Sequence, residues 1–150
     1  MRKILFRGKE LLCNNWVYGD LVQNIVDGET EAMFIVEQSP IAKNYEVNPQ
    51  TVGQFTGLTD VNGNMIFEGD IVNFRHDGDF DNKGFRYRNY AVEFINTYVT
   101  YGLRLRNKNI HFPFKKATAL THNAQVVGNI YDNLELLDAD VEILGGDSDA

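Results

Sequence analysis

Residues 56–74, TGLTDVNGNMIFEGDIVNF, contain the features that decide the fold. An Asn-Gly pair at 62–63 is a strong turn signal, and the apolar run 65–67 follows it directly. A second turn at 68–70, Glu-Gly-Asp, leads into the β-branched run that begins at Ile71. Short strands joined by tight turns predict an antiparallel meander or the start of a small β-barrel.

Strand signals dominate the rest of the chain as well. Short β-rich runs separated by turn residues predict strands at 3–6, 16–22, 32–36, 71–74, 86–96, 99–108 and 125–131. The Asp27-Gly28 pair predicts a hairpin, and Asn48 before Pro49 predicts one capped helical turn. A second helical turn is predicted at 132–137. Because no long segment keeps a helical apolar period, we predict a mainly β fold with minor α.

The length of 150 residues and a hydrophobic content of 43% suit one folded domain with a sizeable core. We predict a single β domain over residues 1–137, with N-terminal strands at 1–38, a connecting loop at 39–52 and a barrel-like part at 53–137. The loop contains two of the three prolines. Residues 138–150 carry five acidic and no basic residues, which predicts an acidic tail.

The composition also restricts the compartment. A single cysteine, Cys13, excludes a disulfide framework, and no apolar run is long enough for a transmembrane helix. The chain starts with basic residues, but the apolar run at 4–6 is shorter than the roughly 7–15 residues of a signal-peptide core. We therefore expect a cytoplasmic protein with a reduced thiol and no membrane association.

Most catalytic patterns are absent from the sequence. His76, His111 and His122 have no metal-ligand spacing to one another or to Cys13. The two serines, at 39 and 148, do not lie in a nucleophile elbow, and no phosphate-binding glycine loop is present. We predict no catalytic residue, no metal and no cofactor, and we lean toward a protein that is not an enzyme.

Three acidic patterns leave an enzymatic alternative open. Residues 60–64 start like a calcium loop, but Met65 and Ile71 occupy the positions of its glycine and its glutamate. The DGDFD stretch at 77–81 alternates carboxylates without completing a coordination shell. Glu68 and Asp70 flank a glycine, where a turn-stabilising role is the simpler interpretation. We reject the calcium loop at 60–64, and the second alternative function is a metal-assisted hydrolase that uses Glu68, Asp70 or the carboxylates at 77–81.

Several of these segments together resemble the YopX family of phage and prophage proteins. The block at 52–72 carries most of the resemblance, with VGNIYDN at 127–133 and Leu136-Leu137 later in the chain. FRG at 6–8 and WVYG at 16–19 fit the same pattern, so the resemblance spans residues 1–137. It implies a small, largely β protein encoded by a phage or prophage. No activity is established for the family, so it assigns no functional residue.

Charge is distributed unevenly along the chain. Residues 83–116 contain eight Lys and Arg and one acidic residue, Glu93, although the whole chain has a net charge of −7. The remaining residues therefore include six basic and twenty acidic side chains. Aromatic residues, which suit base stacking and protein interfaces equally, are interleaved with the cations. These are Phe85, Tyr87, Tyr90, Tyr98 and Tyr101.

The register of the hairpin predicted at 86–108 decides whether these cations form one surface. Arg86 and Arg88 share one strand face, and Arg104, Arg106 and Lys108 share another. A loop with an odd number of residues puts all five on one face, where like charges oppose each other unless an anionic group answers them. The acidic tail, an acidic partner, a nucleotide or a nucleic acid would serve. A loop with an even number separates the two groups.

We therefore hypothesise an accessory protein that acts by binding a host protein or an anionic small ligand. The candidate binding residues are Arg86, Arg88, Arg104, Arg106, Lys108, Tyr87 and Tyr90. A nucleic-acid-binding small-barrel module is the first alternative, disfavoured by the negative net charge. Because an exposed hairpin edge tends to be paired, we also expect a homo-oligomer.

Overall fold

The computed structural model describes residues 1–76, 85–97, 99–104, 111–113, 124–138 and 142–144. Their elements are β-strands and two short 3-10 helices, so the predicted mainly β fold with short helical turns is confirmed. No helix in these ranges is long and apolar enough to cross a membrane. The chain divides into two compact units, Met1–Gly57 and Leu58–Ala150, a division within the range that we predicted as one domain.

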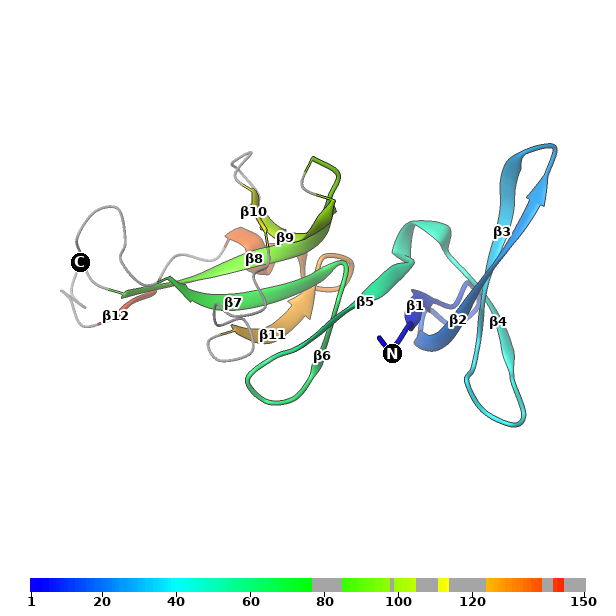
Figure 1. Cartoon of the computed structure of the whole chain (residues 1–150), viewed down its shortest axis with the longest axis horizontal. Coiled ribbons are helices and arrows are strands. Elements are labelled where there is room, and N and C mark those ends of the chain that lie inside the picture. The colour runs from blue at the N-terminus through cyan, green and yellow to red at the C-terminus, as the bar shows by residue number, and fades with distance from the viewer. Residues whose placement is uncertain (77–84, 98, 105–110, 114–123, 139–141, 145–150) are drawn as a thin grey trace. The chain divides into compact units, whose positions relative to one another are not determined.

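The first unit is an antiparallel sheet with the strand order β4-β3-β2-β1-β5 (Figure 1). Strand β5 spans the boundary between the units and leads into β6. The elements are β1 (Phe6–Lys9), β2 (Trp16–Val26), β3 (Glu29–Val36), β4 (Asn44–Val47), the 3-10 helix η1 (Pro49–Thr51) and β5 (Gly53–Thr59).

Two local predictions for this unit are confirmed. Asp27 and Gly28 have φ angles of 51° and 81°, so they form the two-residue hairpin turn between β2 and β3. Asn48 caps η1, because its side chain accepts a hydrogen bond from the Gln50 amide at 3.1 Å and Pro49 follows it. The loop predicted at 39–52 was wrong in part, since β4 lies within it and pairs with β3.

The second unit is a sheet with the order β10-β9-β8-β7-β11, and β12 pairs with β8 off this path. The strands predicted at 86–96 and 99–108 correspond to β8 and β9, although β9 ends at Arg104. The elements are β6 (Met65–Phe67), β7 (Asp70–His76), β8 (Phe85–Ile95), β9 (Thr100–Arg104), β10 (His111–Pro113), β11 (Ala124–Asn129), the 3-10 helix η2 (Leu134–Asp138) and β12 (Glu142–Leu144).

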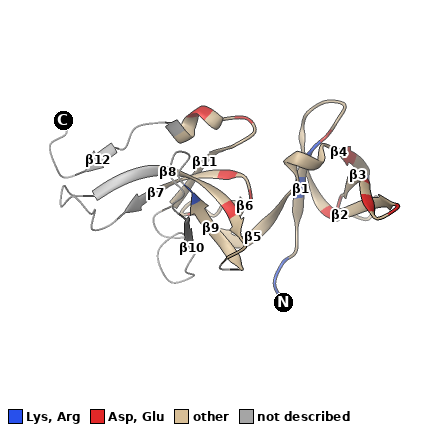
Figure 2. Ribbon diagram, turned by 90° about the horizontal axis from the view of Figure 1, so that it is seen from above, with Lys and Arg blue, Asp and Glu red and all other residues tan. Residues whose placement is uncertain are grey.

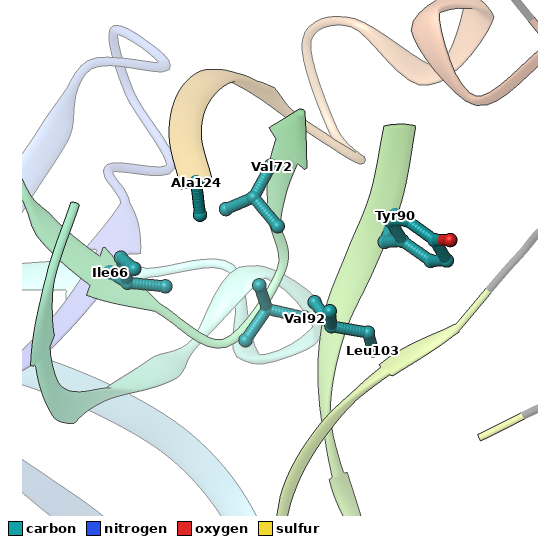
Figure 3. Close-up of a cluster of buried hydrophobic side chains, with 6 residues drawn as sticks. All are labelled: Ile66, Val72, Tyr90, Val92, Leu103 and Ala124. Carbon is teal, nitrogen blue, oxygen red and sulfur yellow. The ribbon is translucent and has the colours of Figure 1, made fainter. Parts of the chain in front are cut away.

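The core of the second unit follows from strand register. Val72 pairs with Tyr90 and with Val126, and Val92 pairs with Leu103, so these side chains share one face of the sheet. Figure 3 shows the buried cluster, which β6, β7, β8, β9 and β11 all supply. Its members are Ile66, Val72, Tyr90, Val92, Leu103 and Ala124.

Candidate functional site

The register of the β8–β9 hairpin separates the predicted basic residues. Ile95 pairs with Thr100, which leaves four residues in the connection, an even number. Phe94 and Tyr101 are opposite each other, with ring centroids 5.4 Å apart in an edge-to-face arrangement. Arg104 pairs with Ala91, so it lies on the face opposite to that of Tyr90 and Val92.

Only part of the predicted basic set lies within the described residues. For Arg86, Tyr87 and Arg88 the structure describes the backbone, in which Arg86 and Arg88 occupy positions on the face of Tyr90 and Val92 and Tyr87 a position on the other face. Arg104 is on the other face, where its Nε lies 3.6 Å from the Glu93 carboxylate. Arg106 and Lys108 lie outside the described residues. The described part of the hairpin therefore does not bring its cations to one face.

Tyr90 requires a correction. We grouped it with the candidate binding residues because it is an aromatic residue near arginines. It is only 2% exposed and belongs to the core cluster of the second unit, so it is not a surface contact. Strand alternation explains this position, because Val72 and Val92 share its face.

The acidic tail lies beside the basic strand. Within the residues predicted as a tail, β12 pairs antiparallel with β8, with Glu142 opposite Tyr87 and Ile143 opposite Arg86. The protein's own C-terminal segment thus runs along the backbone of the strand that carries two of the predicted cations. In this register the residue opposite Arg86 is apolar, and Glu142 occupies a position on the face of Tyr87.

The Asp60 carboxylate holds a turn. It accepts hydrogen bonds from the amides of Asn62 (2.9 Å), Asn64 (2.8 Å) and Val126 (2.9 Å), and from the Asn64 side chain at 3.2 Å. Burial alone raises the pKa of Asp60, but these hydrogen bonds outweigh it and hold the pKa below its usual value. The carboxylate thereby ties the 60–64 turn to β11.

Asp70 has a similar structural role. It is 2% exposed, and its carboxylate accepts a 2.7 Å hydrogen bond from the Phe67 amide across the turn. Gly69, inside that turn, has a φ of +87° and donates its N–H to the Val92 carbonyl. The turn-stabilising interpretation of the Glu-Gly-Asp motif therefore accounts for Asp70 without a catalytic step.

The described ranges provide no further support for metal chemistry. They contain no group of three or more His, Cys, Asp or Glu side chains that would hold a metal ion. The DGDFD stretch at 77–81 and His122 lie outside the described residues.

Cys13 is exposed, and its Sγ donates to the Glu10 carboxylate at 2.6 Å. A thiol beside a carboxylate lacks the positive neighbour that activates a nucleophilic cysteine.

The C-terminal motif of the predicted family resemblance also forms a turn. The Asn129 side chain accepts hydrogen bonds from the amides of Tyr131 (3.0 Å) and Asp132 (2.9 Å). The Asn133 side chain accepts from the Asn129 amide at 3.3 Å. These polar residues stabilise the chain between β11 and η2, so they act in folding.

An exposed apolar row on the first unit was missed in the sequence. Tyr18, Val22 and Val26 are every fourth residue of β2, so they share one face with Asp20 and Asn24 between them, and they are 44%, 48% and 46% exposed. Val22 pairs with Phe34 of β3, which is half-buried on the same face. We call Tyr18, Val22 and Val26 the β2 row. Its spacing of four residues was visible in the sequence, but both faces of β2 carry apolar residues, so alternation did not show which face is exposed.

The surroundings of the β2 row are acidic. Residues 10–42 contain no Lys or Arg, and the β2–β3 hairpin carries Asp20, Asp27, Glu29 and Glu31. Figure 2 shows red segments along β2 and β3 without blue among them. Asp20 lies on the face of the row, and the cations next to the row, Arg7 opposite Tyr18 and Lys9 opposite Trp16, are buried.

The start of β2 is fixed by two cations from β1. Arg7 and Lys9 are 5% and 7% exposed. The Arg7 guanidinium carbon lies 4.5 Å, and the Lys9 ammonium 5.5 Å, from the centroid of the Trp16 ring. Lys9 is also the cross-strand partner of Trp16. Cations over an indole face are attracted by its quadrupole, so this cluster anchors the base of the hairpin.

The fold and the sequence are both similar to those of known proteins. The fold is similar to the crystal structure of protein EF1440 from Enterococcus faecalis, with a TM-score of 0.54 and 21% sequence identity. The similarity covers 91% of this chain and 99% of that one. No curated protein matches the sequence. Residues 5–138 match the YopX protein family. The chain therefore belongs to the YopX family, as its sequence motifs predicted.

Proposed function

We propose that this phage-type protein acts by binding a protein of its bacterial host, in the cytoplasm, through the β2 row. The observation that carries the proposal is the exposure of this row on a hairpin that has little support from the rest of its sheet. Family membership suggests a phage-type protein of uncharacterised function, with which an accessory binding role agrees.

The support of the hairpin ends well before its tip. In the described residues, β1 pairs with β2 only from Trp16 to Gly19, and β4 pairs with β3 only from Met33 to Val36. The part from Asn24 to Ala32 is a two-stranded ribbon, visible as the blue hairpin in Figure 1. An isolated ribbon of this kind is marginally stable in water. A partner that covers its apolar face would therefore stabilise it.

Charge indicates the chemistry of the partner. An apolar strip edged by Asp20, Asp27, Glu29 and Glu31 complements a protein surface with an apolar centre and a Lys- and Arg-rich rim. The same carboxylates repel a nucleic-acid backbone. The charge of the hairpin thus favours a protein partner over the nucleic-acid alternative. The hydrolase alternative has less support, because the carboxylates of Asp60 and Asp70 already accept hydrogen bonds within turns.

The test compares two faces of the same strand. Val22→Ser with Val26→Ser removes the apolar side chains of the β2 row, and Ile25→Ser changes the adjacent residue on the other face, which is 58% exposed. Host proteins captured by each variant are quantified by mass spectrometry, and the selected partner is purified. We expect wild type and Ile25→Ser to bind the purified partner equally, and the double variant to bind at least tenfold more weakly.

Two outcomes would overturn the proposal. Equal binding by the double variant would remove the β2 row from the interface. The other outcome comes from light scattering of the isolated protein. If the wild type is an oligomer and the double variant is a monomer, the row mediates contacts between copies of this chain. A predicted homo-oligomer that persists in the double variant is compatible with the proposal.

A further inference from the structure

The C-terminal strand β12 closes one edge of β8 in the second unit. Strand β7 pairs with β8 from Arg86 to Ala91, which occupies one edge of that strand. Among the described residues, strand β9 pairs with Ala91–Ile95 on the other edge and not with the start of β8. Because β7 already pairs with Arg86, the pairing of β12 with Phe85–Tyr87 uses the edge that β9 leaves open. In Figure 1 the red β12 lies beside the start of the green β8.

The chain that leads to β12 is anchored independently of it. Asn89 of β8 donates its side-chain N–H to the Leu136 carbonyl of η2 at 2.8 Å. The Asn89 side-chain oxygen accepts from the Asn73 amide group at 2.9 Å, which links β7, β8 and η2. Strand β12 itself runs along β8 from Tyr87 to Phe85. Release of β12 therefore leaves the anchor in place and the strand tethered nearby.

The pairing of β12 with β8 is short and complementary in charge. It comprises three residue pairs, from Glu142 opposite Tyr87 to Leu144 opposite Phe85. The chain after Leu137 carries five acidic and no basic residues, whereas residues 83–116 carry eight basic and one acidic. A three-residue strand contributes few ladder hydrogen bonds, so it is readily exchanged for a longer one of the same character.

We propose that the β8 edge at Phe85–Tyr87 is a strand-acceptor site for an extended acidic segment of a partner protein, and that β12 is its displaceable internal occupant. Extended peptides bind open sheet edges through main-chain hydrogen bonds. Acidic residues of such a segment suit Arg86 and Arg88 of β8, although three Asp residues precede this strand at 77–81. Alternating apolar residues suit the sheet, as in the internal EIL strand. The site lies in the second unit and does not depend on the β2 row.

The tether sets how strongly β12 competes. A strand joined by a few residues to an anchored helix has an effective concentration on the order of millimolar at the edge. An external segment of equal intrinsic affinity is therefore excluded until β12 is released. A partner with a longer strand, or with more ladder hydrogen bonds, overcomes this competition.

The experiment opens the edge within the full-length chain. The Ile143→Pro variant removes an N–H and the strand geometry from β12 while retaining the charge of the tail. Ser148→Pro makes the same change in the tail outside β12 and serves as the control. The probe is a fluorescent peptide with the sequence of residues 138–150, DADVEILGGDSDA. Binding is followed by fluorescence anisotropy.

We expect Ile143→Pro to bind the probe at least tenfold more tightly than wild type, and Ser148→Pro to behave as wild type. Hydrogen exchange at residues 85–87 should become faster in Ile143→Pro and slow again when the probe is added. Absence of probe binding by Ile143→Pro, with normal exchange protection in β7 and β11, would overturn the acceptor site. Equal binding of a scrambled peptide would show charge attraction without strand pairing and would also overturn it.

Discussion

The two units of this protein bury opposite charges and use them differently. In the second unit the buried acids Asp60 and Asp70 are hydrogen-bonded by backbone amides inside turns. In the first unit the buried polar residues Arg7 and Lys9 are cations that contact the ring of Trp16. The acids define local backbone shape, whereas the cations fix the base of a projecting hairpin. The buried charges of the second unit therefore stabilise turns, and those of the first unit stabilise the base of the hairpin that carries the exposed β2 row.

Apolar residues are both buried and exposed in each unit, and in the first unit Ile35 and Val47 are fully buried. The second unit gathers Val72, Val92 and Leu103 into a buried cluster. The first unit leaves Val22 and Val26 nearly half exposed on one strand. Burial of large apolar side chains drives folding, so an exposed row contributes little to the isolated chain and is available for association. If this is correct, substitutions at buried turn residues of the second unit should reduce stability, and substitutions in the β2 row should leave it nearly unchanged.

The largest expected effect is the loss of the Asp60 carboxylate. Asp60→Ala leaves three backbone amides without their acceptor and removes one of two links between the 60–64 turn and β11, the other being the Val61 N–H to the Ala124 carbonyl. Because hydrogen bonds to a charged group contribute about 1.5–3 kcal/mol each and are not additive, we expect a loss of about 3 kcal/mol in the free energy of unfolding. Urea unfolding measures this loss.

The control for Asp60 is the neighbouring exposed residue Asn62. Asn62→Ala keeps the backbone amide that Asp60 accepts from, so we expect a loss below about 0.5 kcal/mol. If Asp60→Ala costs as little as Asn62→Ala, the carboxylate is not structural, and a chemical role for Asp60 must be considered again.

The next largest loss of stability is expected at Gly69, with Gly63 as the comparison. Gly69→Ala introduces a Cβ into a left-handed backbone with φ +87°, and that atom would lie 2.9 Å from the Tyr131 ring. Gly63→Ala has a similar φ of +82° but no atom within 4 Å. Left-handed backbone costs an L-residue roughly 1–2 kcal/mol, so we expect losses of about 2 kcal/mol at Gly69 and about 1 kcal/mol at Gly63. Thermal unfolding of both variants checks the order, which equal losses would contradict.

A pH series isolates the charge of Asp60. Hydrogen bonds lower its pKa in the folded chain only, so the folded protein binds this proton less readily than the unfolded chain does. The resulting stabilisation is complete above the unfolded pKa of about 3.9 and is lost as the pH falls through the lower folded value. The stability difference between wild type and Asp60→Asn, measured by urea unfolding from neutral to acidic pH, should therefore shrink on acidification. A difference independent of pH would contradict this linkage.

Local signals in the sequence predicted much of the fold. The Asp27-Gly28 turn and the Asn48 cap follow from backbone chemistry that operates within a few residues, and both are present. The strands β4, β5, β10 and β12 were not predicted, and the strand predicted at 3–6 is displaced, since β1 is Phe6–Lys9. Strands β4, β10 and β12 are short, and β12 lies in a stretch whose acidic composition favours solvent. Their pairing depends on neighbours distant in sequence, which local patterns do not report.

The candidate site was harder to predict for a related reason. The face that Arg104 occupies depends on whether an odd or even number of residues connects β8 and β9, and composition does not fix that number. The core position of Tyr90 and the exposure of Val22 raise the same problem, because β2 and β8 both have apolar residues on each face. Sequence alternation identifies two faces, and only the packing of other strands shows which one is covered.

The smallest expected stability change tests the first unit. Val22→Ser with Val26→Ser removes apolar atoms that are already nearly half exposed, so the free energy of unfolding should fall by about 0.5 kcal/mol per site or less. Ile25→Ser, on the other face and 58% exposed, should cost a similar amount. Urea unfolding of the three proteins at one concentration provides the comparison.

A loss above about 2 kcal/mol in the double variant alone would contradict the division between the units. A change of that size is characteristic of side chains that are buried in the native state. The β2 row would then be covered in the folded protein, by contacts that belong to its own architecture. A small, equal loss in both variants would instead separate binding from stability, because the same substitutions that abolish partner binding would leave the fold intact.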